Sequence, residues 1–397
     1  MPGPLAGIRV LELGSTVAAP AAGRMLADLG ATVYKVEPPE GDQLRTWGSQ
    51  APDGSSWWFK SHNRNKSLLT FDLRDSGGAA MVRRMALVCD VVIENFRPGY
   101  LAKVGLDAAS LRAEKPMLVY ASISGYGQDG PYASRPGYGN IAEAMGGFRY
   151  ITGEPDGPPM RMGISIGDEI AGLHAVIGVL AALHGRDRDG RGETIDVALV
   201  ESTFSLLEGA LPEYVHAGEI TRRNGNRYLR AAPSGVYPTR DGEWLAIGGN
   251  GQTIFRRLCE LIDAPELAND PRFATNQARV ANAIELDERI AAWTRERTLD
   301  DANAALGAVG VPAGPVLSVA QIAADPHVVA RGTVASVPDD DGTAIATYAP
   351  VPRLSGRPQR LERAAGAIGR DQQHALRELG FAPAQTPAET NKETTPS

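Results

Sequence analysis

Residues 8–36 read IRVLELGSTVAAPAAGRMLADLGATVYKV, and this stretch decides the fold class. Both ends of it, IRVLEL and TVYKV, are rich in branched apolar side chains, which is typical of buried strands. Between them, Met25, Leu26 and Leu29 recur at the spacing of one helical face. Gly30 then follows as the glycine expected just after a helix end. The stretch therefore predicts a strand, a helix and a second strand, the opening unit of a parallel α/β sheet.

Ligands of α/β proteins bind at the edge of the sheet where the parallel strands end, so residues that follow a predicted strand are candidate binding residues. Residues 89–96 (CDVVIENF) predict a further strand of the same sheet, and Arg97 follows it directly. Arg97 is therefore a candidate contact for an anionic ligand, although a solvated loop arginine fits the same position. The turn after the first strand lacks the Gly-x-Gly-x-x-Gly pattern, so a nicotinamide dinucleotide is weakly supported.

Residues 161–183 (RMGISIGDEIAGLHAVIGVLAAL) place one carboxylate, Asp168, at a Gly-rich turn just ahead of an apolar helix. Ile164 and Ile166 indicate a short buried strand or loop before that helix. Asp168 fits two roles. It can cap the helix by accepting the N–H groups of the first turn. It can also act as a nucleophile that attacks an activated acyl group. These residues alone favour the cap.

Composition narrows the class of protein. The 397 residues are 43% hydrophobic and 22% charged, which allows two globular domains. A net charge of −7 argues against nucleic acid as the main partner. We expect no apolar run as long as a membrane span and no signal peptide, which makes the cytoplasm the expected location. Cys89 and Cys259 lie far apart and are expected to be core thiols, and the scattered histidines predict no metal site.

The most specific signal is a series of motifs in a fixed order. They are PLAGIRVLELGSTVAAPAAGRMLADLGATVYKVEPP, NRNKSL, ENFRPG, GYGQDGPY, RPGYGNIAEAMGG, TGEPDGPP, GDEIAG, GRGETIDVAL and VPAGPV. With these motifs the chain resembles the family III CoA-transferases, a group that includes formyl-CoA transferase, carnitine CoA-transferase and α-methylacyl-CoA racemase. The resemblance covers roughly residues 4–360.

The resemblance implies a domain organisation. A Rossmann-like large domain is expected from residues 1–205, completed by a C-terminal segment, 326–380. A smaller α+β domain, 231–325, is inserted between them after a polar, Gly- and Pro-rich linker, 206–230. Residues 381–397 have no apolar face and predict a disordered tail. The resemblance also implies an interlocked homodimer, in which each chain threads through the other.

The resemblance further implies that CoA acts as a cosubstrate, with no tightly bound cofactor. The matching CoA-binding candidates are Val17, Lys66, Asn95, Phe96 and Arg97. Arginine and lysine suit the phosphates of CoA, and apolar atoms suit its adenine and pantetheine parts. The partners expected are therefore an acyl-CoA, a small carboxylic acid and a second copy of the chain, with neither nucleic acid nor a membrane.

The catalytic carboxylate of the family falls on Asp168, which is implied to become acylated and then to carry CoA as a thioester. Trp47 and Tyr138 are implied to line the substrate pocket. Gly249, Asn250 and Gly251 resemble a mobile glycine loop that supplies oxyanion contacts, although a plain strand–helix turn explains the same spacing.

The racemase branch of the family is the main rival. It needs a histidine base at the position of Tyr138 and usually an aspartate at that of Gly139. A tyrosine, with an ordinary pKa of about 10, is a poor base at neutral pH, so transfer is favoured. A CoA-binding protein without catalysis is the other alternative. For the acids, succinyl-CoA as donor and a dicarboxylate as acceptor are a hypothesis. A basic run at 222–230 can meet a second carboxylate, or it forms a solvated or dimer face.

Overall fold

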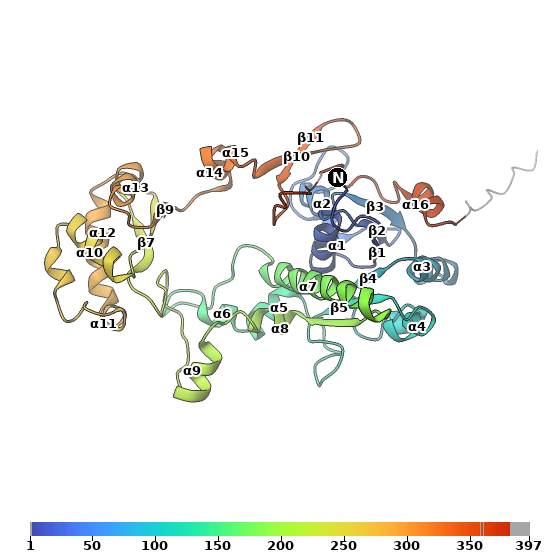
Figure 1. Ribbon diagram of the computed structural model, residues 1–397, viewed down its shortest axis with the longest axis horizontal. Helices are drawn as coiled ribbons and strands as arrows, with labels where there is room; N and C mark the ends of the chain where they lie inside the picture. Colours follow the sequence, from blue (N-terminus) through green and yellow to red (C-terminus); the bar gives the residue numbers. More distant parts are fainter. Residues whose placement is uncertain (1, 358, 360, 382–397) are drawn as a thin grey trace, which may run out of the picture. The chain divides into compact units, whose positions relative to one another are not determined.

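The computed structural model describes residues 2–357, 359 and 361–381, which divide into two compact units (Figure 1). The first unit comprises Met1–Gly146, Gly163–Leu206 and Gly332–Ser397, and the second comprises Gly147–Met162 and Leu207–Arg331. Each unit has its own hydrophobic core.

A parallel six-stranded sheet forms the centre of the first unit, in the order β3-β2-β1-β4-β5-β6. The strands are β1 (Arg9–Glu12), β2 (Thr32–Glu37), β3 (Lys66–Thr70), β4 (Val91–Glu94), β5 (Val119–Ser124) and β6 (Thr194–Ala198). Successive side chains of a strand face opposite sides. Val10 accordingly joins one core cluster and Leu11 the other.

Helices cover both faces of this sheet (Figure 1). On one face lie α1 (Ala18–Asp28) and α7 (Ile166–Asp189). On the other lie α3 (Ser76–Val88), α4 (Ala108–Glu114) and α16 (Gln372–Glu378). The predicted α/β class with a parallel sheet is confirmed. Its strand order reverses between β1 and β4, and ligands bind at such a switch point.

The remaining elements of the first unit surround the sheet. They are α2 (Trp57–His62), α5 (Gly139–Met145), α8 (Leu199–Phe204), the 3-10 helices η1 (Gln43–Thr46) and η2 (Leu101–Val104), and the strands β10 (Val334–Pro338) and β11 (Ala344–Tyr348). The antiparallel β10–β11 hairpin joins the unit through Asp339, whose Oδ2 accepts from Lys60 Nζ at 2.8 Å.

Helix α7 differs from its prediction in two ways. It begins at Ile166 after the N-cap residue Ser165. Of the expected buried strand or loop before it, the loop forms, and Ile164 is exposed there. An 18-residue window of α7 also has a mean hydropathy of 1.6, so the expectation of no apolar run of membrane length is wrong. Half of that window is buried in the unit, where Ala175 and Val179 join the core. We therefore interpret α7 as a core helix.

The second unit combines an antiparallel sheet with helices. Its elements are α6 (Phe148–Ile151), α9 (Ala210–Ala217), β7 (Ser234–Pro238), β8 (Trp244–Gly248), α10 (Gln252–Leu261), η3 (Pro265–Ala268), α11 (Asn276–Ala281), α12 (Ala283–Arg295), α13 (Leu299–Ala308), β9 (Ala313–Pro315), α14 (Val319–Ala324) and α15 (Pro326–Ala330). Cys259 is buried in this core and Cys89 in that of the first unit, and both are free thiols.

The units differ from the predicted domains at four places. Residues 147–162 belong to the second unit because their backbone meets residues 223–225, with Gly225 N donating to Gly153 O at 3.0 Å. The expected linker 206–230 contains α9, and the second unit continues to Arg331. The expected tail 381–397 begins with Phe381, which is buried against the first unit's core; the rest of it lies outside the described residues.

Candidate active site

A cavity of about 330 Å³ opens where four strands of the parallel sheet end. Its lining comes from residues 15, 16 and 18 after β1, 38 and 40–43 after β2, 95–98 after β4, and 123–125 at the end of β5, together with Arg135, Gly137, Tyr138, Asp168 and Leu199. The cavity therefore occupies the switch point of the sheet, where the sequence places a ligand.

Five of the predicted site residues meet in this cavity: Asp168, Tyr138, Asn95, Phe96 and Arg97. Asn95 also joins two of its walls. Its Oδ1 accepts from Ser15 N at 3.0 Å and its Nδ2 donates to Ser15 O at 2.9 Å. The fold thus brings together in one site residues that are far apart in the chain. Asn95 and Asp168, for example, are 73 positions apart.

Three predicted residues of the first unit do not line the cavity. Lys66 is fully buried behind it, where Nζ lies 2.7 Å from Glu12 Oε2 and donates to Pro20 O at 2.8 Å. Protein groups thus already enclose its Nζ, so the side chain does not reach a phosphate in the cavity. Val17 is buried between two lining residues. Trp47 is 41% exposed and lies against Trp58, with ring centroids 6.0 Å apart.

The glycine-containing turn Gly249–Gly251 belongs to the second unit. It links β8 to α10, and Gly251 is the N-cap residue of α10. The Asn250 carbonyl accepts from Arg279 Nη2 at 2.7 Å, and Gly249 N donates to Pro233 O at 2.9 Å. Its role as an oxyanion loop over Asp168 stays a prediction.

Asp168 lies in the first turn of α7 and is not the N-cap residue of that helix. Its carboxylate rests on Gly139, the first residue of α5, so closely that a Cβ on Gly139 would lie 1.9 Å from Asp168 Oδ2. The turn before Asp168 is held by buried Glu143, whose Oε1 accepts from Gly167 N at 3.4 Å. The positive ends of two helix dipoles stabilise the negative charge of a carboxylate that lies beside them. This position suits a nucleophile that must stay ionised.

A second, smaller cavity adjoins the first. It has a volume of about 190 Å³ and shares Ser15, Pro38, Glu40 and Phe96 with the larger one. Its apolar lining is Leu13, Val36, Phe71, Leu73, Phe96 and Tyr100, with Arg74 among its polar residues. An apolar slot beside a polar cavity suits a ligand that has a heterocyclic ring at one end and charged groups further along.

Arg135 is a site residue that the motif RPGYG contains but that we did not single out. It lines the larger cavity, with its guanidinium 3.7 Å from the Tyr132 ring centroid. Stacking on an aromatic ring orients a guanidinium while leaving its N–H groups available. Arg135 and Arg97 are the arginines in the described lining of this cavity.

The wall formed by Phe96 depends on a buried acid. Glu94 ends β4, and its Oε2 accepts from Phe96 N at 2.7 Å. Burial raises the pKa of Glu94 to about 7, although hydrogen bonds from Ser122 and the Phe96 amide oppose that rise. The protonation state of Glu94 therefore changes near neutral pH.

The described residues hold no group of three or more histidine, cysteine and acidic side chains that could bind a metal ion. Histidine is likewise absent from the described lining of the cavity around Asp168. The arrangement there is a carboxylate with nearby helix starts, arginines and an apolar slot. That set can bind a large anionic ligand and attack an electrophilic carbon, and it offers no imidazole base for proton abstraction.

Comparison with known proteins identifies the family of the chain. A family model described as CoA-transferase family III matches residues 5–372. The succinyl-CoA–D-citramalate CoA-transferase of Chloroflexus aurantiacus is 45% identical over 379 residues, covering 95% of this chain and 94% of that protein. The succinate–glutarate CoA-transferase of Agrobacterium fabrum is 42% identical over 384 residues, covering 95% and 96%.

A crystal structure of a CaiB/BaiF family protein from Brucella suis has a TM-score of 0.85 and 39% identity to this chain, and the match covers 96% of this chain and 100% of that one. The resemblance found in the sequence motifs is thereby confirmed. The chain belongs to CoA-transferase family III and is an acyl-CoA:carboxylate CoA-transferase.

Proposed function

We propose that the protein moves CoA from succinyl-CoA to a dicarboxylic acid and that Asp168 is the nucleophile. The observation that carries the site is the Asp168 carboxylate, held at two helix starts in the cavity at the sheet's switch point. The substrate class is supported by the relatives, which are named for succinyl-CoA with D-citramalate and for succinate with glutarate.

The proposed reaction has four acyl-transfer steps. An Asp168 oxygen attacks the thioester carbon, the C–S bond breaks, and a mixed anhydride and CoA thiolate form. The thiolate attacks the Asp168 carbonyl, which releases succinate and leaves CoA on Asp168 as a thioester. The acceptor carboxylate attacks this thioester to give a new anhydride and thiolate. Attack of the thiolate on the acceptor's carbonyl then yields the new acyl-CoA and frees Asp168.

The chain's own groups have separate roles in these steps. We propose that Arg97 and Arg135, which line the larger cavity, bind phosphates of CoA and that the apolar slot beside Phe96 takes its adenine or pantetheine part. Each tetrahedral intermediate carries an oxyanion, which needs N–H donors. The Gly249–Gly251 turn of the second unit is the proposed source of such donors.

We also propose that the protein is an interlocked, cytoplasmic homodimer with the second unit as an inserted domain. The support is an apolar face on the first unit, formed by α5, α7 and α8, which contact one another. Exposed side chains on it are Ile141, Met145, Leu173, Ile177 and Phe204. Exposed apolar side chains on helices that contact one another are typical of a surface that meets a partner, and a second copy is the occupant we propose.

Mass spectrometry after mixing the protein with succinyl-CoA and hydroxylamine tests the nucleophile. Asp168 should be converted to a hydroxamate, and Asp168→Ala should show no such adduct. A panel of mono- and dicarboxylic acceptors tests the substrate class, which turnover of monocarboxylates alone would refute. Deuterium exchange at the α-carbon of a 2-methylacyl-CoA, without acyl exchange, would favour the racemase alternative instead.

A further inference from the structure

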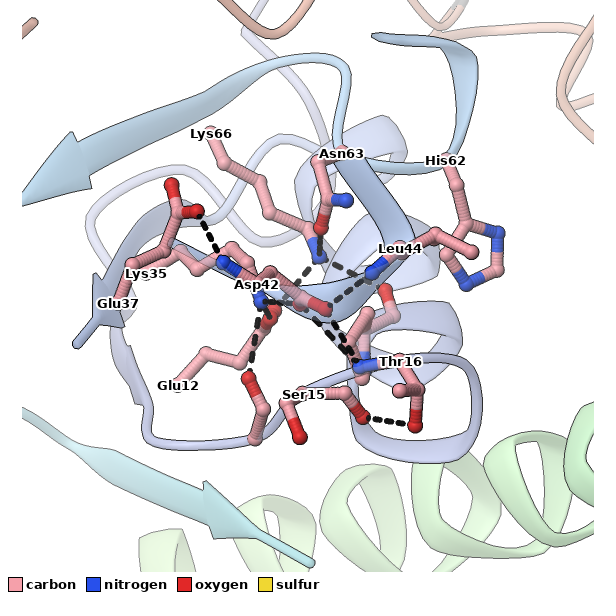
Figure 2. Close-up of polar contacts among 12 residues, drawn as sticks. Glu12, Ser15, Thr16, Lys35, Glu37, Asp42, Leu44, His62, Asn63 and Lys66 are labelled. Carbon is pink, nitrogen blue, oxygen red and sulfur yellow. Dashed lines mark hydrogen bonds and ion pairs between the residues drawn. The ribbon is translucent and has the colours of Figure 1, made fainter. Parts of the chain in front are cut away.

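A buried ionic cluster adjoins the proposed CoA cavity, and we define it as Glu12, Lys35, Asp42 and Lys66 (Figure 2). Of these four residues, Asp42 is among those that line the cavity. Lys35 Nζ lies 3.0 Å from Glu12 Oε1 and 2.9 Å from Asp42 Oδ2. It also donates to the carbonyl oxygen of Gly14 at 2.8 Å. Burying so many charges costs desolvation energy, so stability alone does not explain the cluster. The proposed acyl-transfer steps do not use any of these four groups.

Asp42 connects this cluster to the β1–α1 loop (Figure 2). Its Oδ1 accepts from Thr16 N at 3.0 Å and from Leu44 N at 2.9 Å, while Oδ2 faces Lys35. Thr16 has a φ of 62°, in the left-handed region that is unfavourable for a residue with a Cβ. The Asp42 carboxylate thus binds the backbone N–H of Thr16, the residue of this loop whose positive φ is unfavourable.

The restrained loop is part of the proposed CoA cavity. Ser15, Thr16 and Ala18 line it together with Asp168. On the far side of the loop, Ser15 exchanges two hydrogen bonds with Asn95, at 3.0 and 2.9 Å. If Thr16 relaxed to a negative φ, the direction of the chain at Ser15 would change and these two bonds would be lost. The cavity wall therefore depends on the Thr16 conformation.

The charge state of Asp42 is compatible with a permanent restraint. Burial by itself would raise the pKa of Asp42, but Lys35 and the amides of Leu44 and Thr16 outweigh it, so its pKa lies below the usual value. Lys35 likewise keeps a raised pKa because its acidic neighbours Asp42, Glu12 and Glu37 outweigh burial. Both groups remain charged at neutral pH.

We propose that Asp42, oriented by Lys35, is a positioning residue that holds Thr16 in its left-handed conformation and so forms the wall of the acyl-CoA cavity. The identity of the ligand rests on the proposed function; the link between Asp42 and the loop does not. A purely structural cluster makes a different prediction, because its loss would lower stability and leave the cavity of the folded protein unchanged.

Two variants separate these possibilities. Asp42→Asn keeps the shape but places an amide N–H₂ against either Lys35 or the Thr16 and Leu44 amides, which are all donors. Thr16→Pro leaves the buried cluster intact, removes the N–H and forces φ negative. Asp107→Asn is the matched control, since Asp107 accepts from Ser110 N at 3.1 Å at the start of α4, away from the cavity lining.

The readouts are the dissociation constant of CoA, the KM and kcat with succinyl-CoA, and hydrogen exchange of the peptide spanning residues 13–19. We expect both variants to bind CoA about tenfold more weakly, because the cavity wall at Ser15 and Thr16 is displaced in each of them. KM should rise while kcat at saturating succinyl-CoA stays close to that of the wild type, and exchange in the peptide should be faster. The control should match the wild type.

A second-site variant provides the decisive result. Glycine adopts positive φ readily, so Thr16→Gly added to Asp42→Asn should restore much of the CoA affinity. Wild-type affinity and exchange in folded Asp42→Asn and Thr16→Pro would overturn the proposal, as would lowered stability without weaker binding. If the wild type itself does not bind CoA, the proposed function fails, and the hydrogen exchange of the loop still tests the role of Asp42.

Discussion

Replacing Gly139 by alanine tests most directly whether activity depends on the present position of the Asp168 carboxylate. The new Cβ would lie 1.9 Å from Asp168 Oδ2 and 2.7 Å from Cγ, whereas ordinary contacts begin near 3.4 Å. Either the carboxylate or the start of α5 must therefore move by about 1.5 Å. The side chain of Asp168 moves more easily than the start of α5, because α5 packs against α7 and α8.

The size of the effect follows from this displacement. Misplacing a reacting group by about 1 Å can lower a rate about 100-fold, which corresponds to about 2.7 kcal/mol in activation free energy. We expect kcat to fall by about that factor. Because Gly139 is not among the residues that line either cavity, the KM for succinyl-CoA should change little.

The assay is steady-state transfer from succinyl-CoA to glutarate, combined with hydroxamate formation at Asp168. Gly185→Ala is the control, since a Cβ at this position of α7 has no heavy atom within 4 Å. The thermal midpoint of both variants shows whether the fold is kept. If Gly139→Ala is folded and has the wild-type kcat, the reasoning is refuted. The space left by glycine at residue 139 would then not be needed to position the Asp168 carboxylate.

Three further predictions concern the pocket wall, the CoA phosphates and the dimer. In the folded protein the pKa of Glu94 is about 7 instead of 4.5, so its ionisation destabilises the fold increasingly as pH rises between these values. Glu94→Gln should therefore gain up to about 3 kcal/mol over the wild type between pH 4.5 and 8, and equal pH profiles in calorimetry would contradict this. Arg135→Ala should raise the KM for succinyl-CoA about tenfold with kcat nearly unchanged, an increase that high salt should reduce if the contact is ionic. Ile177→Asp, on the apolar face of α7, should shift the sedimenting species from dimer to monomer, whereas Val88→Asp on the opposite side of the sheet should not; dimers in both variants would argue against that interface.

Much of the fold followed from local patterns. The β1–α1–β2 unit lies where its apolar periodicity predicts, and Asp75 caps α3 as a residue of its type should. The motif order identified the family, and with it Asp168, Tyr138 and the segment 95–97. These features depend on residues close together in the chain, or on whole motifs, so the sequence carries them directly.

Other features depend on contacts that sequence patterns do not encode. The family resemblance assigns Lys66 to CoA, yet its side chain turns inward to Glu12, a partner 54 residues away in the chain. No sequence pattern marks Asp42, and only the fold brings its carboxylate to the Thr16 amide. The segment 147–162 was assigned to the large domain, although its partners lie some 70 residues further on.

By itself, therefore, the amino-acid sequence determined the α/β class and the family, and it predicted which carboxylate we propose as the nucleophile. The tertiary structure alone decided which charged side chains face the cavity and which are enclosed behind it. It also showed that Gly139 leaves the space that the carboxylate of Asp168 occupies. The physical reason is that a residue type sets which interactions a side chain can make, whereas burial and the distance to partners, which only folding brings together, select among them.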